Sequence, residues 1–197
     1  MTITVRVAHP EDATGIQAIY APIVRHTPIS FEIDVPTVDE MRTRIGRTLE
    51  THPWLVAESD GHVCGYAYAT TFRPRRAYQW CADVSVYVEA GSRRSGVARA
   101  LYTPLFSLLA LQGFVTLHAG ITLPNPASVG LHESFEFTTV GVLKRVGFKL
   151  GAWHDVGVYQ KSLGPRGESP NSPVAFHAMD AAQVERCLRP QTRASRF

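Results

Sequence analysis

The chain has 197 residues, of which 45% are hydrophobic and 19% are charged, and its formal net charge is +3. This composition is typical of one soluble globular domain with a sizeable core, and so weak a positive charge does not by itself indicate nucleic acid. The cysteines Cys64, Cys81 and Cys187 form no CxxC pair, which argues against a disulfide framework or a zinc ribbon. The first residues predict neither an export leader nor a membrane span, so we expect a cytoplasmic protein.

Local signals define the elements of the N-terminal half. Residues 3–7 indicate a strand, and Pro10 suits the first turn of the helix that follows. After a loop at 26–36, Thr37 and Glu40 fit a capping box that begins a second helix. An Asp-Gly dipeptide between two apolar runs then predicts a β-hairpin.

Strands and helices alternate in the second half. A strand at 80–88 places Asp83 on the face opposite to a row of apolar side chains. Gly113 stops the next helix, whose apolar spacing continues across Pro104. The expected ranges are 95–112 for this helix, 115–121 for a strand, 125–135 for a short helix, and about 137–147 and 152–162 for two final strands.

The order β-α-α-β-β-β-α-β-α-β-β predicts a mixed α/β sheet domain. We expect this domain to comprise residues 1–163. From residue 164 the composition shifts to Gly, Pro and Ser, so residues 164–197 are expected to form a C-terminal extension, a linker with a short helix at 177–189.

The stretch SRRSGVAR, residues 92–99, joins the strand at 80–88 to the helix after it, and it has the outline of an anion site. Backbone N–H groups at a helix start are unpaired, and the helix dipole adds positive charge there. Gly96 and Ala98 leave room for a ligand, while Arg93 and Arg94 add charge. The spacing matches neither GxxxxGK[ST] nor GxGxxG. A tight, solvated turn is the alternative.

The spacing R-x-x-G-x-A at 93–98 resembles the pyrophosphate signature of the GNAT N-acetyltransferases. Further segments are similar to phosphinothricin N-acetyltransferases and to the related methionine sulfoximine or sulfone acetyltransferases, and the likeness extends over residues 3–163. These segments are PWLVAE (53–58), AYQW (77–80), VYV (86–88), LPNPASVGLHE (123–133) and GAWHDVG (151–157).

The resemblance implies a single GNAT-type domain with a mixed, mostly antiparallel central sheet and helices on both faces. It also implies direct transfer of an acetyl group from acetyl-CoA to the α-amine of a small amino-acid-like acceptor, by a homodimer. The histidines show no HExxH or other ligand spacing, so we expect no metal, and the sequence gives no reason to expect a nucleic-acid or membrane partner. The residues expected at acetyl-CoA are Val86, Tyr87, Val88, Arg93, Arg94, Ser95, Gly96, Val97, Ala98, Arg99, Asn125 and Ser128.

Two residues are candidates for the chemistry. An α-amine with a pKa near 8 is partly protonated at neutral pH, so a placed carboxylate can remove its proton. Asp83 holds the position where the family normally has Glu, and its shorter side chain favours a bridging water. A strand-edge carboxylate paired with an arginine is the alternative. His132 stands where related acetyltransferases often have a Tyr that protonates the thiolate, and as a lone histidine it could instead be a satisfied polar residue.

Four residues are expected at the acceptor: Phe31, Arg73, Arg75 and Tyr78. Arginine suits a carboxylate or phosphinate because its guanidinium donates two parallel hydrogen bonds. A solvated basic loop is the alternative. His154 and Asp155 are strand neighbours that point to opposite faces, so we expect a structural role or a dimer contact rather than a catalytic relay.

Two other functions remain open. A GNAT acetyltransferase could act on another amine, such as a protein N-terminus, an aminoglycoside or a polyamine, although arginines in the acceptor loop fit cationic acceptors poorly. A non-catalytic acyl-CoA-sensing or nucleic-acid-binding module is the other, but the sequence does not interleave aromatic stacking residues with basic ones.

Overall fold

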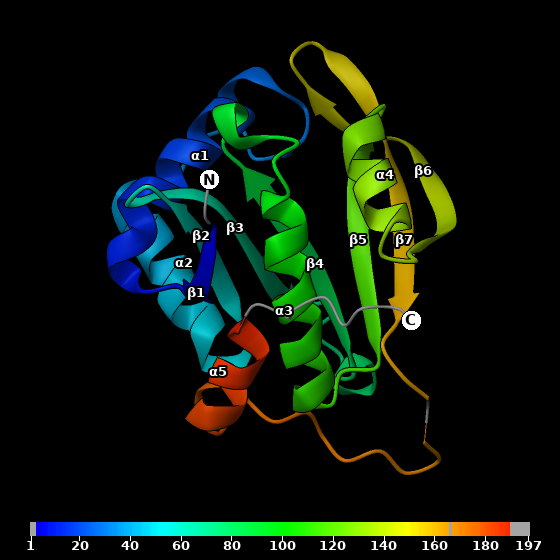
Figure 1. Cartoon of the computed structure of the whole chain (residues 1–197). Helices are drawn as coiled ribbons and strands as arrows, with labels where there is room; N and C mark the ends of the chain where they lie inside the picture. Colours follow the sequence, from blue (N-terminus) through cyan, green and yellow to red (C-terminus); the bar gives the residue numbers. More distant parts are fainter. Residues whose placement is uncertain (1–2, 166, 190–197) are drawn as a thin grey trace, which may run out of the picture.

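The computed structural model describes residues 3–165 and 167–189 and contains a seven-stranded sheet in the order β1-β2-β3-β4-β5-β7-β6 (Figure 1). The predicted mixed, mostly antiparallel sheet is therefore confirmed. The strands are β1 (Thr4–Val7), β2 (Trp54–Ser59), β3 (His62–Thr71), β4 (Cys81–Val88), β5 (Thr116–Leu123), β6 (Thr138–Lys149) and β7 (Ala152–Ser162).

Helices cover both faces of this sheet. Two of them, α1 and α2, pack on one face around Tyr66 and Val56. The opposite face carries α3 together with α4 and α5, and Figure 1 shows these three in front of the strands. None of the helices in the described ranges is long and apolar enough to cross a membrane. The helices are α1 (Ala13–His26), α2 (Val38–Thr51), α3 (Val97–Gln112), α4 (Pro126–Glu133) and α5 (Ala181–Leu188).

The local signals act as the sequence predicts. The Thr37 side chain accepts a hydrogen bond from the Glu40 N–H, and the Glu40 carboxylate accepts one from the Thr37 N–H, so the capping box that begins α2 is confirmed. The β2–β3 hairpin turns at Asp60 and Gly61, both with positive φ. Helix α3 continues through Pro104, as its apolar spacing predicts.

β4 and β5 pair over a short length only and then separate. β4 and β5 are parallel and pair only at Cys81–Thr116, Ala82–Leu117 and Asp83–His118. Beyond that point β5 continues to pair with β7 as far as Leu123, while Val84–Val88 pair with β3 alone. No strand in the described ranges covers the other edge of Val84–Val88. The strands therefore part at Asp83 and His118.

The segment after β7 returns to the domain. Gln112, the last residue of α3, accepts a hydrogen bond at its carbonyl from the Val174 N–H and donates one from its side chain to the Val174 carbonyl. The Trp80 indole donates to the Asn171 carbonyl at 2.8 Å. Helix α5, within the range where we expect a terminal helix, packs against α3 and the core behind it.

Candidate active site

The turn before α3 has the geometry of an anion site. Gly96 is the N-cap at φ 90°, and its carbonyl accepts the N–H of Ala100. The amides of Val97, Ala98 and Arg99 precede that first helical bond, so helix geometry leaves them without an intrahelical acceptor. A Cβ on Gly96 would meet no atom within 4 Å apart from its chain neighbours, so the backbone at Gly96 borders open space. The amides and the helix dipole can together bind a phosphate group.

The arginines of this stretch differ in their surroundings. Arg93 and Arg94 are exposed, and Arg94 has a positive φ of 60°. The Arg99 guanidinium donates to the Ser134 hydroxyl at 2.8 Å and lies 4.9 Å from the centre of the Phe135 ring. The Arg99 side chain is therefore directed to the end of α4. Only the backbone amide of Arg99 lies at the candidate anion site.

Asp83 lies in a row of polar residues that crosses the sheet on the face covered by α1 and α2. Residues paired directly across a sheet point to the same face. The pairings Thr70–Asp83, Asp83–His118, His118–Gln160 and Gln160–Thr138 therefore place five side chains in line. Asp83 stands where β4 and β5 part, so its carboxyl group is beside the open edge of β4.

The environment of Asp83 suits a general base. Its carboxylate has no hydrogen bond or ion pair in the part of the chain that the structure describes. Burial raises the pKa of Asp83 to about 6, and the positive charge of Arg73 acts in the opposite direction. A carboxylate with this pKa is ionised at neutral pH and still accepts a proton readily, because its charge is poorly solvated.

The His132 side chain is buried, with only 3% of the residue exposed. Its Nδ1 is 2.8 Å from the Ser128 carbonyl, which can only accept, so Nδ1 carries the hydrogen. In the neutral ring Nε2 then accepts from the Tyr102 hydroxyl at 3.1 Å. Burial lowers the pKa of His132, which favours this neutral form, although the Ser128 bond opposes the shift. Both ring nitrogens of His132 therefore have hydrogen-bond partners, the Ser128 carbonyl and the Tyr102 hydroxyl.

The predicted N-cap of α4 is present, because the Asn125 side chain accepts from the Ser128 N–H at 3.2 Å. This contact fixes the start of α4 next to the end of β5. Three further cofactor candidates, Val86, Tyr87 and Val88, lie on the part of β4 that has no strand on its second edge. Ser95, in the turn before α3, donates its hydroxyl to the Ser92 carbonyl at 2.6 Å. Tyr87 points to the α1 face, where its ring packs against Tyr20.

Two acceptor candidates gather beside Asp83. The Arg73 guanidinium lies 5.1 Å from the ring centre of Phe72 and 5.8 Å from that of Tyr78. Phe72 stacks on His118 with ring centres 3.9 Å apart. Because His118 is the strand partner of Asp83, this cluster brings a positive charge to the base. Arg75 begins the turn Arg76–Tyr78 and is exposed.

Phe31 lies farther along the same face. Its ring packs on Gly147 of β6, where a Cβ would come within 2.1 Å of it, and lies 6.3 Å from the His154 ring. The loop around it is fixed by the buried Lys149 ammonium, which donates to the Ser30 carbonyl at 2.6 Å. His154 and Asp155 have separate partners, Lys149 and Lys144, so they form no relay with each other.

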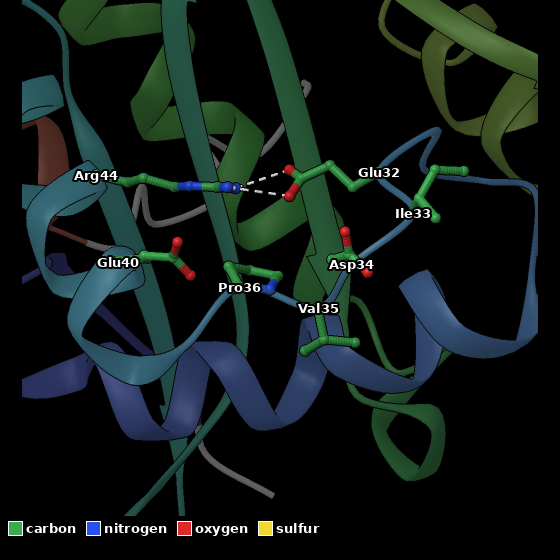
Figure 2. Close-up of a pocket in the computed structure, with 7 residues that line it drawn as sticks. All are labelled: Glu32, Ile33, Asp34, Val35, Pro36, Glu40 and Arg44. Atoms are coloured by element: carbon green, nitrogen blue, oxygen red, sulfur yellow. Dashed lines mark hydrogen bonds and ion pairs between the residues drawn. The ribbon is translucent and has the colours of Figure 1, made fainter.

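Two hollows adjoin Arg44 of α2. One, of about 260 Å³, is lined by Glu32, Asp34 and Glu40, and Figure 2 shows the Arg44 guanidinium facing both carboxylate oxygens of Glu32, at 2.7 and 3.0 Å. The other, of about 190 Å³, has Arg44 as a shared wall and reaches Thr70, the strand partner of Asp83. Its other lining residues are Tyr20, Met41, Thr48, Trp54, Tyr66 and Tyr68.

Comparison with known proteins identifies this arrangement. The model of the family described as "Acetyltransferase (GNAT) domain" matches residues 5–158. The chain belongs to the GNAT acetyltransferase family. It is 43% identical over 162 residues to a phosphinothricin N-acetyltransferase of Alcaligenes faecalis, covering 81% of this chain and 82% of that one. It is 32% identical over 162 residues to an L-methionine sulfoximine/L-methionine sulfone acetyltransferase of Salmonella typhimurium, covering 82% and 95%.

A solved GNAT structure also matches. The phosphinothricin acetyltransferase of Sinorhizobium meliloti, in complex with AcCoA, superposes with a TM-score of 0.82 at 32% identity, covering 89% of this chain and 99% of that one. The fold and the acetyl-CoA-dependent N-acetyltransferase activity that the sequence predicts are thereby confirmed.

Sequence reasoning missed three residues next to the GNAT site: Phe72, Tyr102 and His118. Tyr102 belongs to the apolar face of α3, so its spacing indicates only a core position. His118 is the one ionisable residue of the strand Thr116–Leu123, a signal that could have directed attention to it. Its contact with Phe72 depends on the register of two strands, which the sequence does not reveal.

The raised pKa of Asp83 predicts a cost in stability. The folded state holds the proton more strongly than the unfolded chain, so the free energy of unfolding falls as pH rises from about 4 to about 6. Asp83→Asn removes this dependence and stabilises the fold at pH 7 by on the order of 2 kcal/mol. The free energy of unfolding of wild type and Asp83→Asn is measured by urea unfolding across pH 4–8. Asp34→Asn, at an exposed residue, is the control. Equal stability of wild type and Asp83→Asn at pH 7 would contradict the assignment.

Proposed function

We propose that the acceptor is the α-amine of a small amino-acid analogue of the phosphinothricin or methionine sulfoximine/sulfone type. The cluster of Arg73 and Tyr78 beside Asp83 carries this proposal, because it sets a cation for the acceptor's acidic group next to a base for its amine. The names of the relatives support the same substrate class.

Two parts of the chain are proposed to bind acetyl-CoA, which supplies the acetyl thioester. The open amides of Val97, Ala98 and Arg99 suit its pyrophosphate, and the free edge of Val84–Val88 offers N–H and C=O groups to its amide arm. The space in front of Gly96 supports this fit, since a Cβ there would meet nothing within 4 Å.

Asp83 takes the proton from the acceptor ammonium, and the neutral amine then attacks the thioester carbonyl. Its short side chain favours a water between carboxylate and amine. The departing thiolate needs a proton, and His132 stays our candidate for the group that supplies it, because it stands where related acetyltransferases often have a Tyr in this role. The Tyr102 hydroxyl, 3.1 Å from Nε2, holds the His132 ring in place. The cytoplasmic location remains a prediction.

A panel of amines tests the function. Turnover of acetyl-CoA is measured with phosphinothricin, methionine sulfoximine and methionine sulfone, and with an aminoglycoside, a polyamine and a peptide N-terminus. We expect turnover with the three amino-acid analogues. Turnover restricted to the other amines would contradict the proposed acceptor, and binding of acetyl-CoA without any turnover would contradict the catalytic reading.

The anion site is tested by Gly96→Ala. The added Cβ points into the space proposed for the pyrophosphate, and the φ of 90° strains any residue other than glycine. We expect acetyl-CoA affinity to fall about tenfold, which is ~1.4 kcal/mol. Gly113→Ala is the matched control, because it carries the same backbone strain at the other end of α3. Equal affinity of both variants would remove the pyrophosphate assignment.

Arg73→Ala tests the acceptor site. We expect the KM for anionic amino-acid analogues to rise about tenfold, more than for neutral amines, because the charge-assisted hydrogen bonds are lost. Loss of the positive charge also raises the pKa of Asp83, so the acidic limb of kcat/KM moves to higher pH. Arg75→Ala should also raise this KM, while Arg76→Ala serves as the neighbouring control. Equal effects on anionic and neutral acceptors would place the acceptor elsewhere.

We also propose that a second copy of the chain covers the β6–β7 hairpin. β6 is an edge strand of 12 residues whose second edge has no strand in the described ranges. Such an edge with exposed apolar side chains favours association. The exposed large hydrophobic residues of the hairpin are Val140, Val142, Leu143, Val146, Phe148, Leu150 and Trp153.

The oligomeric state tests this surface. Light scattering after size exclusion should give twice the chain mass for the wild type and the single chain mass for a Val142→Lys, Phe148→Lys double variant. Val174→Lys, at an exposed apolar residue outside the hairpin, is the control and should remain dimeric. A monomeric wild type, or a dimeric double variant, would contradict the proposal.

A further inference from the structure

The chain after β7 is fixed to the domain although it lies beyond residues 5–158, which the GNAT model matches. Figure 1 shows it crossing the lower end of α3 before it reaches α5. We call residues 171–188 the C-terminal strap. The proposed mechanism does not use the strap.

Buried contacts anchor the strap at the C-terminal end of α3. The Gln112 side chain, 1% exposed, donates to the Val174 carbonyl at 2.7 Å. Phe176 belongs to the main core. Nδ1 of His177 is 2.6 Å from the Glu50 carbonyl, which can only accept, so the ring donates this bond. The strap is therefore held against both α2 and α3 and can serve as a fixed support.

The acceptor segment, residues 72–80, has few supports of its own. Residues 73–78 are exposed. Within the described ranges, residues 73–79 make no hydrogen bond to any other part of the chain, and their two backbone bonds, at 2.9 and 3.1 Å, only close the turn at Arg76–Tyr78. Phe72 holds the start of the segment by its stack on His118, and Trp80 holds its end.

Trp80 joins the acceptor segment to the strap. Its carbonyl accepts the N–H groups of Val115 and Thr116, at 3.0 and 3.3 Å, which fixes its backbone to the start of β5. Its indole Nε1 donates to the Asn171 carbonyl of the strap at 2.8 Å. The side chain of Trp80 is thus bound to the strap only two residues after Tyr78.

We propose that Trp80 is a positioning residue through which the C-terminal strap fixes the acceptor segment. This rests on the proposed acceptor site at Arg73 and Tyr78. A ligand that must first order a loose segment binds more weakly, because the lost conformational entropy opposes binding. The strap therefore raises affinity for the acceptor without contacting it. The amides proposed for acetyl-CoA, at Val97–Arg99, do not depend on this contact.

Kinetics of Trp80→Phe test the proposal, because Phe keeps an aromatic ring and lacks the N–H. We expect the acceptor KM to rise about fivefold, as for the loss of one neutral hydrogen bond, while kcat and the KM for acetyl-CoA change by less than about twofold. Ser162→Ala is the control, since it removes a bond of similar length, to the Gly164 carbonyl at 3.0 Å, outside the strap. An unchanged acceptor KM, or an equal rise in both KM values, would overturn the proposal.

A second variant acts from the strap itself. Val184 of α5 packs against the main core, and Val184→Asp puts a charge there, which loosens the strap. We expect the acceptor KM to rise again. The combined variant should differ little from Val184→Asp alone, because both changes act through the bond between Trp80 and Asn171. Effects that add in full would contradict this single route.

Hydrogen exchange of the free protein needs no turnover and separates this inference from the proposed function. In Trp80→Phe the amides of Tyr78 and Gln79, which close the turn, should exchange about fivefold faster, while those of Thr116–Leu123 stay unaltered. Equal exchange at Tyr78 and Gln79 in wild type and variant would overturn the inference even if the enzyme acetylates amino-acid analogues. Faster exchange in an enzyme that rejects those analogues would support the strap contact and contradict the proposed acceptor.

Discussion

Because β5 parts from β4 after the Asp83–His118 pair, Val84–Val88 keep an edge to which no strand is added in the described ranges. An unpaired strand edge presents N–H and C=O groups at regular spacing, which an extended ligand with amide groups can match. The turn that follows β4 ends in the open amides of α3. In the proposed function, one interruption of the sheet therefore serves both ends of the acetyl-CoA binding path, and Asp83, the proposed base, lies where that path begins.

The two faces of the sheet contribute differently to this site. On the α3 face the side chains of β4 and β5 are apolar and join the main core, which fixes the strands. On the opposite face the polar row leaves Asp83 half-buried and without a partner. The fold keeps this charge at a cost in stability, as functional sites commonly do. Arg73 limits that cost and supplies the charge that the proposed acceptor requires.

Much of the fold could be predicted from the sequence because its signals are local. Thr37 with Glu40 begins α2 through the hydrogen bonds of a capping box, and Gly113 ends α3 through its left-handed backbone conformation. The site was predictable only as far as its motif extends. The Tyr102 hydroxyl bonds to His132 across α3 and α4, and His118 is the strand partner of Asp83 through the register of β4 and β5, so neither arrangement leaves a pattern in the sequence.

Hydrogen exchange of the backbone amides, with and without acetyl-CoA, tests the central claim most directly. We predict that acetyl-CoA slows exchange of the amides in Val84–Val88 that do not bond to β3, and of those at Val97–Arg99, while Thr116–Leu123, already paired with β7, change little. Binding of acetyl-CoA that leaves exchange at Val84–Val88 and at the start of α3 unaltered would contradict the claim that the parting of β4 and β5 forms the cofactor site.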